Sequence, residues 1–140
     1  MRKFLIFSTF VLIFGSLAAQ QTITWQNLQG VTYAYVDKRN QTFMYGKATF
    51  SPPTRALEGK EVLISGYIIP GGVDGSQYYL SANPLATCFF CGGSGPESII
   101  ELRTSGRKEK YQLDEWVTIK GILRLNDKEM ELTYALENAV

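Results

Sequence analysis

The sequence predicts an all-β fold, a small five-stranded barrel preceded by an aromatic-rich N-terminal extension. Two observations carry this prediction. From Glu61 onward, short segments of alternating apolar and polar residues follow one another, separated by turn residues. Two of these segments contain a glycine at mid-strand, which is typical of a strand that bends at a barrel corner.

The first segment of the chain, residues 1–19, has the features of a secretory signal peptide. Two basic residues precede a largely apolar run from Phe4 to Phe14, and small residues end the segment at Ala18 and Ala19. The run is shorter than the roughly 20 residues that a membrane-spanning helix needs. We therefore expect cleavage near these alanines, a periplasmic or secreted product, and no membrane span after cleavage.

Residues 20–140 form one predicted domain, in which 20–57 are the N-terminal extension. Within the extension, the side chains of VTYAYV, residues 31–36, alternate as in a strand, which predicts a hairpin or an extended wrap over the barrel. We expect its aromatic rings, Trp25 and Phe50 among them, to be buried against the barrel. The alternative is that these rings form a stacking platform for bases or sugars.

Five segments after the extension are predicted to be the strands of the barrel. They are EVLISGYII (61–69), QYYLS (77–81), SIIELR (98–103), WVTIKGILRL (116–125) and EMELTYAL (129–136). Gly66 and Gly121 are the mid-strand glycines, and Asn126 and Asp127 make the last turn. Five short strands, two of them bent, fit a closed barrel of the oligonucleotide/oligosaccharide-binding (OB) type. The connection 104–115 is too short for the usual helix, so we expect a loop or one short turn there.

The mature chain would be close to neutral. Removing residues 1–19 takes away two of the 14 basic residues and none of the 13 acidic ones, which leaves 12 against 13. Because such a chain lacks the basic stripe that binds phosphate backbones, no nucleic-acid partner is expected. Histidine is absent, which removes the usual general base and the commonest nitrogen ligand of zinc. We predict no catalytic residue and expect a binding or assembly module.

The two cysteines, Cys88 and Cys91, lie three residues apart in the connection between the second and third strands. In an exported protein, a disulfide is the default state of such a pair. Alternatively, the two thiolates bind a soft metal ion, copper or zinc, with Glu97 as the candidate third ligand. A third interpretation is a thiol-disulfide redox centre, although the glycines and proline after Cys91 cannot continue the helix that lowers a thiol pKa.

The remaining residues of this connection are expected to make the contacts of a functional face. The glycines would supply positive φ angles for a tight loop that brings the phenylalanines onto the barrel. The candidate contact residues are Phe89, Phe90, Gly92, Gly93, Gly95 and Pro96. The ligand is unknown, and an envelope protein is a candidate partner. Carbohydrate or nucleic-acid binding on the barrel face is a further alternative.

The run ALEGKEVLISGYIIP (56–70), followed by YYLSANP and CFFCGGSGPESIIEL, resembles an uncharacterised family of small exported bacterial proteins. The resemblance covers nearly all of the mature chain, and CFFCGG is its most specific part. It implies export and an OB-like barrel, and it implies no reaction. A more distant likeness is to exported domains with the same first strand and a cysteine in the equivalent loop, some of them associated with transition-metal handling. The matching positions are Trp25, Leu57, Gly59, Lys60, Gly66, Cys88, Cys91, Gly92, Gly93, Gly95, Pro96 and Glu97.

Overall fold

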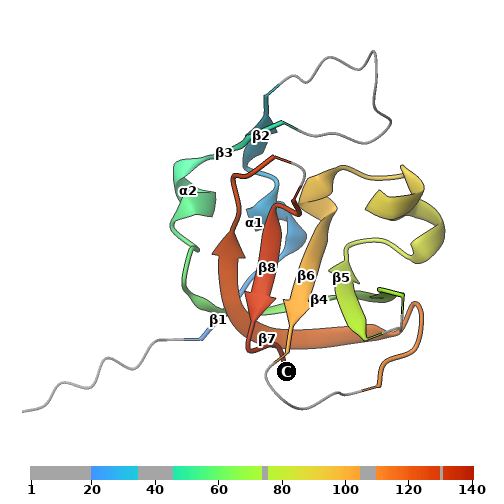
Figure 1. The fold of residues 1–140 in the computed structure, drawn as a ribbon. Coiled ribbons are helices and arrows are strands. Elements are labelled where there is room, and N and C mark those ends of the chain that lie inside the picture. Colours follow the sequence, from blue (N-terminus) through green and yellow to red (C-terminus); the bar gives the residue numbers. More distant parts are fainter. Residues whose placement is uncertain (1–19, 35–45, 74–75, 105–109, 130) are drawn as a thin grey trace, which may run out of the picture.

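The protein is described by a computed structural model that covers residues 20–34, 46–73, 76–104, 110–129 and 131–140. Five strands close into a barrel, which confirms the predicted all-β fold (Figure 1). In their order around the barrel they are β4 (Glu61–Gly71), β5 (Gln77–Ser81), β6 (Ile99–Arg103), β8 (Tyr134–Glu137) and β7 (Trp116–Leu125), and β7 pairs back with β4. The pair β6 and β8 is parallel, and the other four pairs of the barrel are antiparallel. This mixed closure is the one expected of an OB-like barrel.

The two mid-strand glycines lie where their strands change partner. Strand β4 pairs with β7 up to Tyr67 and with β5 from Tyr67 onward, while β7 passes from β4 to β8 at Ile122. Each change comes one residue after a glycine, Gly66 or Gly121. A Cβ atom at Gly66 would lie 2.6 Å from the carbonyl oxygen of Ser81, so no other residue fits without a shift. The predicted bends at barrel corners are therefore confirmed, and the reason for glycine is close backbone approach.

Alternate residues of the five strands fill the barrel. Strand β4, for example, buries its even positions from Val62 to Ile68. The phenol of Tyr134, which is fully buried, donates a hydrogen bond of 2.5 Å to the carbonyl oxygen of Leu28 in the N-terminal extension. The main core residues are Leu28, Val62, Ile64, Ile68, Leu80, Ile100, Leu102, Ile119, Leu123, Tyr134 and Leu136.

Among the described residues of the N-terminal extension, Trp25 and Phe50 pack against the barrel, and the rings at positions 35, 43 and 45 lie outside the described part of the chain. Its described elements are β1 (Gln21–Thr22), α1 (Trp25–Leu28), β2 (Val31–Tyr33), β3 (Ala48–Phe50) and α2 (Pro52–Arg55). The indole N–H of Trp25 donates to the carbonyl oxygen of Ser65 at 2.8 Å, and Phe50 is buried in the core. Strands β2 and β3 pair antiparallel, as the predicted hairpin requires, while residues 35–45 between them lie outside the described part of the chain.

The last strand is shorter than predicted. Pairing of Leu125 with Tyr134 begins the β7–β8 ladder, so strand β8 starts at Tyr134 and not at Glu129. The described residues between β7 and β8, 126–129 and 131–133, instead belong to a connection in which Asn126 makes several hydrogen bonds. The side-chain amide of Asn126 donates to the Glu131 carboxylate at 2.7 Å and to the carbonyl oxygen of Leu132 at 3.3 Å. Such side-chain hydrogen bonds are an alternative to the longer β7–β8 pairing that the alternating residues favour.

Two other expectations concern segments that the structure describes incompletely. In the connection between β6 and β7, residues 110–115 form coil and one turn, which agrees with the expected loop; residues 105–109 lie outside the described residues. The segment 1–19, the predicted signal peptide, also lies outside them. Within the described residues, no helix has the length and apolar character needed to cross a membrane.

Candidate functional site

The loop of residues 82–98, here called the cysteine loop, joins β5 to β6 and contains three short 3₁₀ turns. They are η1 (Leu85–Thr87), η2 (Phe89–Cys91) and η3 (Pro96–Ser98), and the first two lie beyond the upper ends of β5 and β6 in Figure 1. The backbone N–H of Leu85 donates to the Asp114 carboxylate at 2.8 Å. This bond attaches the start of the loop to the connection that precedes β7.

Hydrogen bonds within the loop fix the backbone around the two cysteines. The carbonyl oxygen of Cys88 accepts from the N–H groups of Cys91 at 3.2 Å and Gly93 at 3.1 Å. The hydroxyl of Ser94 donates to the carbonyl oxygen of Thr87 at 2.7 Å and lies 2.8 Å from the side-chain amide nitrogen of Asn83. Hydrogen bonds therefore hold the backbone of the CxxC turn in a defined conformation.

The three glycines after the cysteines differ in what a side chain would meet at their positions. Gly92 has a φ of +74°, and a Cβ atom there would meet nothing within 4 Å, so it fits the predicted left-handed position. Gly93 is limited by space, since a Cβ atom would lie 2.6 Å from the carbonyl oxygen of Thr87. At Gly95, a Cβ atom would meet only the Glu97 carboxylate, the end of a flexible side chain that can move aside, so the structure does not require glycine there. The expectation that all three supply positive φ angles is thus correct only for Gly92.

The two thiols differ in their access to solvent. Cys88 is fully buried and Cys91 is exposed, and the structure contains both as free cysteines. Partial desolvation raises the pKa of the Cys91 thiol above its ordinary value, and the charge and hydrogen bond of the neighbouring Cys88 thiol raise it further. The two thiols are thus close enough to interact without being bridged, and the Cys91 thiol is reachable from outside. A disulfide between them stays a prediction for the oxidised protein.

The structure does not bring Glu97 together with the two thiols. Among the described residues, no group of three His, Cys, Asp or Glu side chains is close enough to hold one metal ion. Glu97 instead lines a pocket of about 300 Å³ together with Trp25 and Gln29 of the extension. Because a structural zinc site needs four ligands, the described donors do not fit zinc. A pair of thiols does fit a soft monovalent ion such as copper(I).

The predicted contact residues include two phenylalanines that pack differently. Phe90 meets Tyr79 on the outer face of β5, with ring centroids 4.9 Å apart, and remains 45% exposed. Phe89 is half-buried and lies 5.6 Å from Phe90 between ring centroids. Pro96, at the start of η3, is buried. The loop thus reaches the barrel through Phe90, as the sequence predicts.

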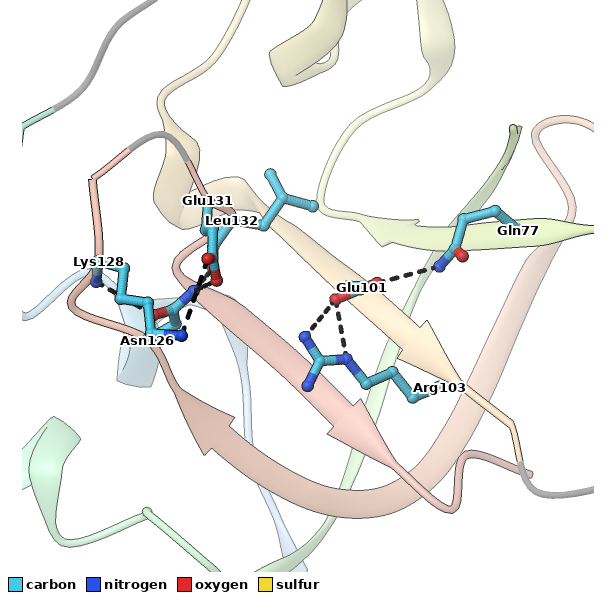
Figure 2. A network of polar contacts seen from close by, with 7 residues as sticks. All are labelled: Gln77, Glu101, Arg103, Asn126, Lys128, Glu131 and Leu132. Carbon is cyan, nitrogen blue, oxygen red and sulfur yellow. Dashed lines mark hydrogen bonds and ion pairs between the residues drawn. The ribbon is translucent and has the colours of Figure 1, made fainter. Parts of the chain in front are cut away.

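A second polar feature on the barrel surface was missed at the level of sequence. Outward residues of β6, Glu101 and Arg103, and the connection after β7 surround a pocket of about 310 Å³ (Figure 2). The alternation of β6 predicts that Glu101 and Arg103 share an outer face. Nothing in the sequence indicates that Asn126 and Glu131 approach them, because residues 129–136 alternate like a strand.

Comparison with known proteins supports the fold. No protein-family model and no curated protein matches the chain. The fold is similar to the crystal structure of a DUF3299 family protein from Pseudomonas aeruginosa PAO1, with a TM-score of 0.53 and 17% sequence identity. The match covers 85% of this chain and 92% of the other. At this identity the likeness concerns the fold alone.

Proposed function

We propose that this chain is an exported binding module whose functional face is the cysteine loop, and that Cys88 and Cys91 together bind copper(I). The observation that carries the proposal is the pair of adjacent free thiols, one buried and one exposed, on a hydrogen-bonded turn. Soft thiolate ligands select copper(I), and this ion accepts fewer ligands than zinc. Export rests on the signal-like residues 1–19, and an envelope protein is the expected partner of a metal-carrying loop.

A binding role fits the thiols better than a redox role. A catalytic CxxC pair needs a thiol that is ionised near neutral pH, whereas the pKa of Cys91 is raised. Reactive pairs of this kind also lie at the N-terminus of a helix. Here Cys91 ends a single 3₁₀ turn, and Gly92 stops it with a left-handed conformation. Metal binding does not need a low pKa, because the ion displaces the thiol proton.

Competition for copper(I) tests the proposal directly. Reduced protein would be titrated against bicinchoninate, whose copper(I) complex is coloured, and removal of copper from the complex would be followed by absorbance. We expect one copper ion per chain for the wild type and none for Cys88→Ser or Cys91→Ser. Glu97→Gln is the matched control and should bind as the wild type does, since its carboxylate lies away from the thiols.

Two results would contradict the proposal. One is equal copper binding by the double cysteine-to-serine variant, which would place the ion elsewhere. The other is failure of the reduced wild type to compete with bicinchoninate at all. Far-UV circular dichroism of each variant should match the wild type, because the loop lies outside the barrel core. Cleavage of the leader is checked separately by N-terminal sequencing of protein from the exported fraction.

A further inference from the structure

The pocket over β5 and β6 has the features of a preformed ligand site, independent of the thiol pair. The outer face of the barrel and residues Asn126, Glu131 and Leu132 line an open pocket of about 310 Å³, and Figure 2 shows the polar groups around it. This volume lies at the lower end of the range for small-molecule pockets. Its lining residues are Tyr79, Glu101, Arg103, Asn126, Glu131 and Leu132.

Hydrogen bonds hold the polar groups of this pocket in place. Arg103 donates through Nε at 2.9 Å and Nη2 at 2.6 Å to one carboxylate oxygen of Glu101, and Gln77 donates to the other at 3.4 Å. Across the pocket, Asn126 holds the Glu131 carboxylate (Figure 2). Groups fixed before a ligand arrives lose little conformational entropy on binding.

The charge around the pocket disfavours an anionic ligand. The pocket and the depression next to it are lined by five carboxylates and three cations, which gives a net charge of −2. Each cation is already paired with a carboxylate: Arg103 with Glu101, Arg124 with Glu137 and Glu58, and Lys128 with Glu131. Oligonucleotide binding needs cations that neutralise phosphates, so this surface does not suit it.

The same groups suit a neutral polyhydroxylated ligand. Carboxylate oxygens accept hydrogen bonds from hydroxyl groups, and the guanidinium N–H groups of Arg103 that do not bind Glu101 can donate to them. Burial, and then the charge of Glu101, raise the pKa of Tyr79, so its phenol stays protonated and can donate as well. Tyr79 also lines the pocket and adds aromatic surface to it. On OB-like barrels this face binds either oligonucleotides or oligosaccharides.

We infer that the pocket lined by Tyr79, Glu101 and Arg103 on one side and by Asn126, Glu131 and Leu132 on the other binds a neutral saccharide. The test uses three neutral disaccharides, cellobiose, maltose and N,N′-diacetylchitobiose, in saturation-transfer NMR with the full chain. At least one should bind the wild type. Its Kd should rise about tenfold or more in Arg103→Ala, since a hydrogen bond to a charged group is lost. Tyr79→Phe keeps the ring and should weaken binding less.

The controls separate this inference from the copper proposal. Lys110→Ala removes an exposed charge outside the pocket and should bind the sugar as the wild type does. Copper(I) titration of Arg103→Ala should be unchanged, so either proposal can fail alone. The inference is overturned by absence of binding of all three disaccharides, by unchanged binding in Arg103→Ala, or by binding of single-stranded oligothymidylate in their place.

Discussion

The ring of Phe90 meets the ring of Tyr79 edge-on, with centroids 4.9 Å apart and an interplanar angle of 68°. Phe90 belongs to the turn that ends in Cys91, whereas Tyr79 belongs to β5 and lines the polar pocket. One aromatic pair therefore joins the two candidate sites. Such pairs contribute about 0.5–1.5 kcal/mol beyond the area they bury, which is enough to decide how firmly a short loop is held.

Loss of this ring pair should loosen the cysteine loop and leave the barrel intact. In Phe90→Ala, we expect the amides of Cys91 and Gly93, which donate to Cys88, to exchange hydrogen about tenfold faster, as local opening becomes easier. Core amides of β4 and β7 should keep their protection. Hydrogen exchange followed by NMR gives both values. Leu113→Ala, at another exposed apolar residue, is the control, and equal exchange in both variants would contradict the role of Phe90.

The difference in exposure between the thiols predicts one fast alkylation and one slow one. Iodoacetamide should add a single group to the native reduced protein, at Cys91, and two groups after denaturation. Because the pKa of Cys91 is raised in the folded chain, the midpoint of its rate against pH should lie above that of the denatured protein. Intact mass spectrometry measures both quantities. A midpoint below that of the denatured chain would instead indicate an activated redox thiol.

The neighbouring glycines should respond differently to substitution. Gly92→Asn should be tolerated better than Gly92→Ala, since asparagine adopts the left-handed conformation more readily. At Gly93 both substitutions should destabilise the loop, because any Cβ atom overlaps the backbone of Thr87. We expect Gly93→Ala to cost about 1–3 kcal/mol, as overpacking does. Urea unfolding compares the variants, and equal stability of Gly92→Ala and Gly93→Ala would contradict the distinction.

Most of the barrel could be predicted from local patterns. The strands 77–81 and 116–125 have the bounds that alternation predicts, and the bends at Gly66 and Gly121 follow from glycine at mid-strand. The last strand was predicted too long, because Glu129 and Glu131 alternate with apolar residues as a strand would. The side chain of Asn126 binds Glu131 and Leu132 in the segment where a strand was expected, and such side-chain hydrogen bonds leave no periodic signal in the sequence.

The site was predictable only where its residues are close in sequence. Cys88 and Cys91 are neighbours on one turn, so their proximity follows from their spacing. Glu97 is nearly as close to the cysteines in sequence, but a new turn begins at Pro96. The Glu97 side chain lines the pocket that Trp25 also lines. The barrel pocket combines residues from β5, β6 and the connection after β7, which only the closure of the barrel brings together.

The buried phenol of Tyr134 makes stability sensitive to alkaline pH. Burial first, and then Tyr33 and Glu97, raise its pKa above the ordinary 10.0, so the folded chain keeps a proton that the unfolded chain releases. Stability should be complete below about pH 10 and fall as the pH rises further. Tyr134→Phe leaves the Leu28 carbonyl without its partner and should lose about 1–3 kcal/mol at neutral pH, with a shallower alkaline fall. Urea unfolding on both sides of pH 10 measures the free energy of unfolding of each variant. Tyr67→Phe, on the outer face, is the control. An equally steep alkaline loss of stability in Tyr134→Phe would assign the effect to other groups.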